Sequence, residues 1–173
     1  MTNNNDIEVD PETTYVVEVS GKTLPEYTIS QQISAWLQSN IAGLTDDKGN
    51  VIFSKVNTGF NQDSLKTFGK KPVCDVYIDR VEYSDTFDVT QPDKVHTIVL
   101  FYLKGASNNS YMQACMVHDY LMQEFITNDS FKQLNKIVSN TYIKNSELRI
   151  QPIQKKWGVI GAFELSHMII QRF

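Results

Sequence analysis

Cysteine is scarce in this chain. Of the 173 residues only Cys74 and Cys115 are cysteines, and no Cys-x-x-Cys spacing occurs. The sequence therefore excludes a disulfide framework and a zinc site built on paired cysteines. Both cysteines have apolar neighbours in the sequence, which predicts free, buried thiols and favours a reducing compartment.

Long apolar runs and basic clusters are also missing. No apolar stretch approaches the roughly 18 residues that a membrane span needs, and residues 1–6 lack the basic and apolar regions of a secretion signal. We therefore expect no membrane partner and synthesis in the cytoplasm. The formal net charge of -4 argues against a protein whose main task is to grip nucleic acid, because neutralising phosphates needs clustered lysine and arginine.

The composition is that of a globular protein, with 41% hydrophobic and 21% charged residues. The length predicts a single domain over residues 13–173. Residues 1–12 are polar and acidic and are expected to form a flexible N-terminal arm, because they offer little apolar surface to offset the entropy of ordering. Thr14–Val19 is rich in β-branched residues and is expected to form a short strand that pairs with its own sheet or with a neighbouring subunit.

Hydrophobic periodicity predicts an α+β fold with the element order α-β-β-β-α-α-β-β. In this fold a mostly antiparallel sheet carries its helices on one face. Helical spacing is expected over residues 28–41, 111–126 and 131–138. Alternating or continuous apolar segments predict strands over residues 51–56, 73–81, 96–104, 148–153 and 157–170.

Acidic residues gather on the strand predicted at 73–81 and in the loop that follows it. Apolar residues alternate there with polar ones, the pattern of a strand with one buried and one solvated face. No Asp-x-Asp-x-Asp-Gly loop accompanies the acids, so we expect no metal. In a ring, the acidic face could line a channel for DNA, because like charges prevent sticking. The candidate channel or interface residues are Asp75, Asp79, Asp85, Asp88 and Asp93.

Cys115 and His118 lie one helical turn apart, with Asp119 beside His118, which is the outline of a nucleophilic site. This pair supports an alternative function as an enzyme or small-ligand module. No oxyanion loop or Gly-rich elbow accompanies it, so helix packing is the preferred interpretation, and neither catalytic residues nor a cofactor are expected. Gly158 and Gly161 are expected to mark a bulge or bend in the last strand rather than a phosphate cradle.

As an order of elements over residues 28–170, the chain resembles the tail-terminator or tail-completion proteins of long-tailed bacteriophages. The resemblance rests on the stripe of Ile33, Trp36 and Leu37 on a capped helix, and on the central strands around 74–78 and 98–103. It also rests on the helix 111–126 and on the ending 157–165. It implies a non-enzymatic virion protein that forms a homohexameric ring, stops tail-tube growth and joins the tail to the head.

The partners implied by this resemblance are other copies of the chain, the tail tube protein, the head–tail connector proteins, and DNA that passes through a central channel without specific binding. The implied location is the tail or neck of the virion. Two other non-enzymatic roles remain as alternatives to a tail terminator. The chain could be another structural component of the neck or tail, or a cytosolic interaction adaptor.

Overall fold

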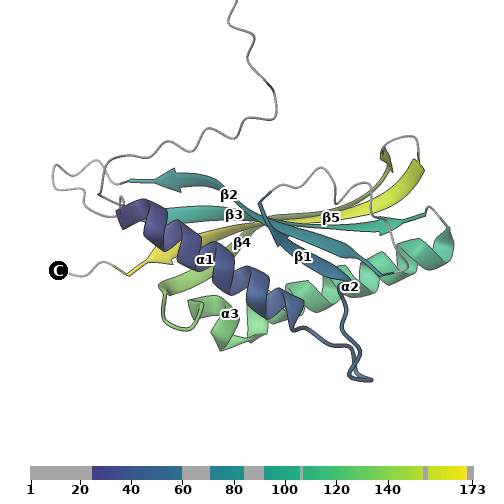
Figure 1. Cartoon of the computed structure of the whole chain (residues 1–173), viewed down its shortest axis with the longest axis horizontal. Coiled ribbons are helices and arrows are strands. Elements are labelled where there is room, and N and C mark those ends of the chain that lie inside the picture. Colours follow the sequence, from purple (N-terminus) through teal and green to yellow (C-terminus); the bar gives the residue numbers. More distant parts are fainter. Residues whose placement is uncertain (1–24, 60–70, 84–91, 106, 154–155, 171–173) are drawn as a thin grey trace, which may run out of the picture.

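Helices cover one face of a single sheet in the structure (Figure 1). The computed structural model describes residues 25–59, 71–83, 92–105, 107–153 and 156–170. Over these residues the α+β class and the predicted element order are confirmed. The elements are α1 (Pro25–Ala42), β1 (Lys55–Thr58), β2 (Val73–Glu82), β3 (Lys94–Lys104), α2 (Asn108–Thr127), α3 (Asp129–Gln133), β4 (Val138–Ile153) and β5 (Lys156–Ile169).

The five strands lie in the order β1-β2-β3-β5-β4. β1 pairs with β2 in parallel, and the other neighbours are antiparallel. The strand predicted at 51–56 is displaced, because Val51 makes only an isolated bridge with Thr45 and the ladder begins at Lys55. The strand predicted at Thr14–Val19 and the arm at 1–12 fall outside the described residues.

Side-chain caps mark the N-termini of α2 and α3. Ser107 caps α2 by accepting a hydrogen bond from the Ser110 amide at 3.2 Å, and Asn128 caps α3 by accepting one from the Ser130 amide at 2.9 Å. In the described part of the chain, no helix combines the length and the apolar character needed to cross a bilayer.

The closing hairpin is longer than the sequence predicted. The helix expected at 131–138 ends at Gln133, because Leu134, Asn135 and Lys136 have positive φ values of 44°, 54° and 69°. Such left-handed residues cannot continue a right-handed helix. The chain instead turns there into β4, which starts at Val138 rather than at the predicted 148 and runs for 16 residues.

The core lies between the helices and the sheet face that they contact, which we call the covered face. The aromatic residues of this core meet edge to face, with the Phe125 ring centroid 5.3 Å from that of Phe163 and 5.5 Å from that of Phe131. The fully buried aliphatic residues include Ile33, Leu37 and Ile41 of α1, Leu121 of α2, Val95 and Val99 of β3, and Leu165 of β5.

The bulge predicted at Gly158 and Gly161 is wrong. The ladder between β3 and β5 runs without a register shift from Lys94 opposite Met168 to Lys104 opposite Gly158. Gly161 lies directly opposite Phe101, and a Cβ atom built on it would fall 2.1 Å from two atoms of the Phe101 ring. The glycine is therefore needed for the close approach of an aromatic side chain.

Candidate assembly surfaces

The sheet face opposite the helices, which we call the open face, carries a cluster of charged side chains toward the end of β2 and the start of β3. Toward the other end of these strands it carries Val73 and Tyr102, each 2% exposed. The Arg80 guanidinium lies 3.1 Å from Asp79, 3.3 Å from Glu82 and 3.3 Å from Glu164. Lys144 on β4 reaches Glu164 at 3.3 Å, and Lys94 on β3 reaches Glu82 at 3.8 Å. These contacts link β2, β3, β5 and β4 in one network.

This network is balanced in charge, because it contains three acids (Asp79, Glu82 and Glu164) and three bases (Arg80, Lys94 and Lys144). All six side chains keep solvent contact, with exposed fractions of 24–44%. Ion pairs with this degree of exposure contribute only about 0–1 kcal/mol each, because water and salt screen them. The open face is therefore a patch of alternating charge rather than a uniformly acidic wall.

A buried histidine adjoins the network. His96 is 1% exposed, and its Nε2 lies 2.9 Å from Oε1 of Glu82. Burial and the positive charge of Arg80 lower the pKa of His96, while Glu82 opposes that shift. His96 is accordingly held in its neutral form at neutral pH.

The structure separates the five candidate aspartates. Asp75 is fully buried and accepts a hydrogen bond from Nδ2 of Asn57 at 2.7 Å, so the prediction that it faces solvent is wrong. Asp79 lies at the irregularity between Ile78 and Arg80 and belongs to the open-face network.

Asp93 is half-buried at the start of β3, where its backbone binds the ends of two neighbouring strands. Its amide donates to the Glu82 carbonyl at 2.8 Å, and its carbonyl accepts from the Ile169 amide at 2.9 Å. Asp85 and Asp88 lie outside the described residues. Of the three predicted aspartates that the structure describes, Asp79 is the one seen to take part in the charge network.

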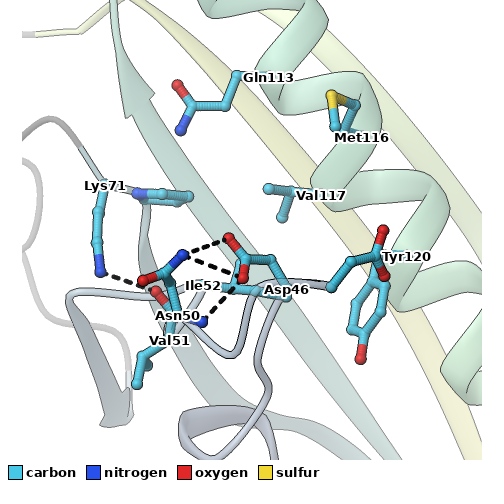
Figure 2. Close-up of a pocket in the computed structure, with 11 residues that line it drawn as sticks. Asp46, Asn50, Val51, Ile52, Lys71, Gln113, Met116, Val117 and Tyr120 are labelled. Carbon is cyan, nitrogen blue, oxygen red and sulfur yellow. Dashed lines mark hydrogen bonds between the residues drawn. The ribbon is translucent and has the colours of Figure 1, made fainter.

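Sequence reasoning missed a groove of about 390 Å³ between α2, the turn at 46–52 and the start of β2 (Figure 2). Its apolar lining includes Ile52, Pro72 and Val117, together with Met116, which is 70% exposed. Methionine fits irregular apolar contacts well because its side chain is flexible. The groove joins residues far apart in the chain, so no continuous sequence pattern marks it.

Polar groups at the rim of this groove are already engaged within the protein. The Asp46 carboxylate accepts hydrogen bonds from the backbone amides of Lys48 and Asn50 at 2.9 and 2.8 Å, and the bonds from Asn50 contribute most to lowering the Asp46 pKa. Lys71 donates to the Val51 carbonyl at 3.0 Å. The groove thus offers apolar contact more than free polar groups, which suits packing better than catalysis.

In the candidate pair of Cys115 and His118, the histidine packs on the sheet. The His118 ring stacks on Phe163, with centroids 4.6 Å apart and an angle of 22° between the planes. Its Nδ1 lies 3.8 Å from the exposed Asp119 carboxylate, and its Nε2 has no hydrogen-bond partner within the described chain. Catalysis would require a hydrogen bond from the thiol to the imidazole, and the ring packs on the sheet instead.

The two edges of the sheet differ in length. β1 forms one edge with 4 residues, and β4 forms the other with 16. Exposed apolar residues gather on the closing hairpin beside the long edge, including Tyr142 (51%), Ile150 (45%) and Trp157 (59%). A long edge strand with exposed apolar neighbours is a site for contact with another chain.

No protein-family model and no curated protein matches this chain. Arguments about its function therefore rest on its own residues and geometry.

Proposed function

We propose that this chain is a structural protein of a long-tailed bacteriophage virion that assembles into a ring, caps the tail tube and joins the tail to the head. The observation that carries the proposal is a sheet with helices on one face and a solvated charge cluster on the other, in which no described strand lies beyond the edge at β4. The order of elements on which the resemblance to tail-terminator proteins rests is also the observed order.

A closed ring requires each subunit to present two different surfaces that fit each other. The edge of β4 with its exposed apolar neighbours supplies one candidate surface. The groove beside Met116 is separate from that edge, and the charged cluster on β2 and β3 supplies a further candidate. An isolated subunit with a 16-residue open edge would be prone to unwanted pairing, and ring closure removes that hazard.

The charges of the open face suit a surface exposed to water or to passing DNA. Its acids are matched by bases, so it has no excess of positive charge with which to hold phosphates. Alternating charge also gives directional contacts between subunits if part of this face is buried in the ring. In both settings the face contributes to assembly or passage rather than to a reaction.

Light scattering coupled to size-exclusion chromatography tests the proposal on the full chain over a wide range of protein concentration. We expect a discrete particle with the mass of a small ring, six copies being the expected number, and closed rings in negative-stain images. Purified tail tubes should bind this particle at their ends. A chain that stays monomeric at every concentration and leaves tail tubes unbound contradicts the proposal.

A further inference from the structure

The second half of β4 has a regular outer edge on which another strand could pair. Register shifts between Val138 and Asn140 and between Ile143 and Asn145 interrupt the first half of its ladder with β5. From Asn145 onward the pairing is regular, and within the described residues no strand lies beyond β4. Bulges turn an edge away from partners, so residues 145–151 form the part of the edge that is open to pairing. We call these residues the docking edge.

We propose that Thr14–Val19 of a second copy of this chain pairs with the docking edge as an added strand. This inference rests on the self-association that the proposed function requires, and it names the segment that joins one subunit to the next. Strand addition uses backbone hydrogen bonds for affinity and alternate side chains for register.

The side-chain pattern of the segment matches that of the edge. In Thr14–Val19, the residues Tyr15, Val17 and Val19 fall on one face of an extended strand. Leu148 and Ile150 point to the covered face of the sheet, where Leu148 packs on the core and Ile150 remains 45% exposed. A strand that places its apolar face on that side covers Ile150 and extends the core.

Charge favours the same partner. Residues 1–21 contain no lysine or arginine, and their acids are Asp6, Glu8, Asp10, Glu12 and Glu18. On the open-face side of the docking edge, Arg149 pairs with Glu147 of the same strand but keeps a side chain that is 66% exposed, and Lys155 and Lys156 follow in the sequence of the hairpin. Glu18 falls on the polar side of the segment, the side that meets Arg149. Opposite charges on neighbouring strands stabilise such a pair modestly and help to fix its register.

Chain length keeps the segment from reaching the docking edge of its own subunit. Ser20–Leu24 links the segment to α1, and five extended residues span at most about 17 Å. α1 packs on β1 and β2, and a position beyond β4 is four strand spacings from β2, or about 19 Å. Figure 1 also shows that α1 begins at one end of the long axis while the β4–β5 turn lies at the other.

Disulfide cross-linking between mixed chains tests this pairing. One chain carries Arg149→Cys, and the other carries a single cysteine in the segment; Cys115→Ser in both removes the half-buried native thiol. Neighbouring strands hold facing Cβ atoms about 4.5–5.5 Å apart, close to what a disulfide needs. We expect the most efficient cross-linking with Glu18→Cys, less with Val16→Cys and Thr14→Cys, and none with Tyr15→Cys or Val17→Cys.

A charge exchange provides a second measurement that needs no cysteine. Arg149→Glu alone and Glu18→Arg alone should each lower the assembled fraction, and the two changes together should restore it. Lys132→Glu, on α3 and away from the hairpin and the groove, is the matched control and should leave the assembled fraction unchanged.

Three results overturn the inference. Equal cross-linking at all five segment positions indicates random collision rather than a strand, and cross-links to Asn57→Cys of β1 within a single chain place the segment on its own sheet. Rings that form without any segment cross-link overturn the strand exchange but leave the proposed function standing. A full chain that is only monomeric overturns both.

Discussion

The covered face and the open face of the sheet differ in what their side chains can contribute. On the covered face, Val99, Phe163 and Leu165 are fully buried against the helices. On the open face, Arg80, Glu164 and their partners remain in contact with water. Burial of apolar surface contributes about 25 cal/mol per Å², whereas exposed ion pairs contribute little. The fold therefore depends mainly on the covered face, and the charged cluster of the open face is available for contacts with other molecules.

Buried polar groups break this division on both faces, and His167 is the one with a partner on each ring nitrogen. His167 lies on the covered face, where it is fully buried, and both of its ring nitrogens meet threonine hydroxyls. Nε2 is 2.7 Å from Oγ1 of Thr97, and Nδ1 is 2.9 Å from Oγ1 of Thr141. The histidine is tolerated there because each nitrogen has a partner, one as donor and one as acceptor.

The two faces should differ most in the free energy of unfolding that is lost when one aromatic residue on each is replaced by alanine. Phe163→Ala removes a fully buried ring that contacts Phe125 and should lower the free energy of unfolding by about 3–5 kcal/mol. Tyr142→Ala, at a position 51% exposed on β4, should change it by less than about 0.5 kcal/mol. Urea denaturation measures both, and similar losses would contradict the division between the faces.

Acid should destabilise the covered face through His167. Burial, with a smaller contribution from His96, lowers the pKa of His167 to about 3, whereas an unfolded histidine has a pKa near 6.5. The folded state then binds fewer protons, so this contribution is fully present above about pH 6.5 and is lost as the pH falls toward 3, by up to about 3–4 kcal/mol.

His96 shifts the same way, so the two histidines must be separated. His167→Gln keeps a donor and an acceptor for the threonines but does not titrate. Unfolding free energies of the two proteins, measured from pH 7 to pH 4, should show a shallower fall for His167→Gln. Parallel curves would assign the acid sensitivity to other groups.

The contact between Gly161 and Phe101 tests packing on the covered face at the scale of one methyl group. Gly161→Ala forces the Phe101 ring to move and should cost about 1–3 kcal/mol. Gly43→Ala is the matched control, because a Cβ there meets only ordinary contacts of 3.6 and 3.7 Å. Thermal unfolding distinguishes the two, and an unchanged melting temperature for Gly161→Ala would mean that the ring has room to shift.

The open-face network should matter less than any of these. Arg80→Gln removes contacts to three carboxylates but should lower the free energy of unfolding by less than about 1 kcal/mol, because the pairs are solvated. The loss should shrink further in high salt. A loss above about 2 kcal/mol would show that the network is structural.

The smallest effect on stability is expected from the acidic residues of the candidate channel. Asp79, Asp85, Asp88 and Asp93 changed together to Lys should leave particle assembly intact while slowing DNA ejection, because new phosphate contacts hold the DNA. Asparagine at the same four positions is the control and should behave as the native chain. Asp75 is left unchanged because it is buried. If the Lys variant ejects DNA at the normal rate, these residues face solvent and do not line the channel. If it fails to assemble, these acids lie at a contact between subunits.

The sequence predicted secondary structure and buried faces correctly where apolar residues kept one spacing, helical or alternating, over a whole element. Alternation identified the covered side of β2 through Cys74, Val76 and Ile78, and helical spacing identified the buried stripe of α1. Alternation gives the side of a strand but not the depth of burial, which is why Asp75 was wrongly placed in solvent.

Features that depend on contacts between residues far apart in the chain could not be predicted from the sequence. The left-handed turn at Leu134–Lys136 contains no glycine from which it could be predicted. The predicted helix therefore ran past Gln133, and the prediction missed the start of β4. Gly161 looked like a bulge because its partner, Phe101, lies on another strand. The groove beside Met116 joins three separate segments and had no continuous pattern.

Hydrogen exchange of the assembled full chain tests the central claim most directly, namely that the open edge at β4 is where subunits join. Peptides covering residues 145–151 should exchange slowly in the ring and much faster after dilution to monomers. Peptides covering β3, which is already paired on both sides, should exchange slowly in both states. Rings in which residues 145–151 exchange as fast as in the monomer would contradict the account.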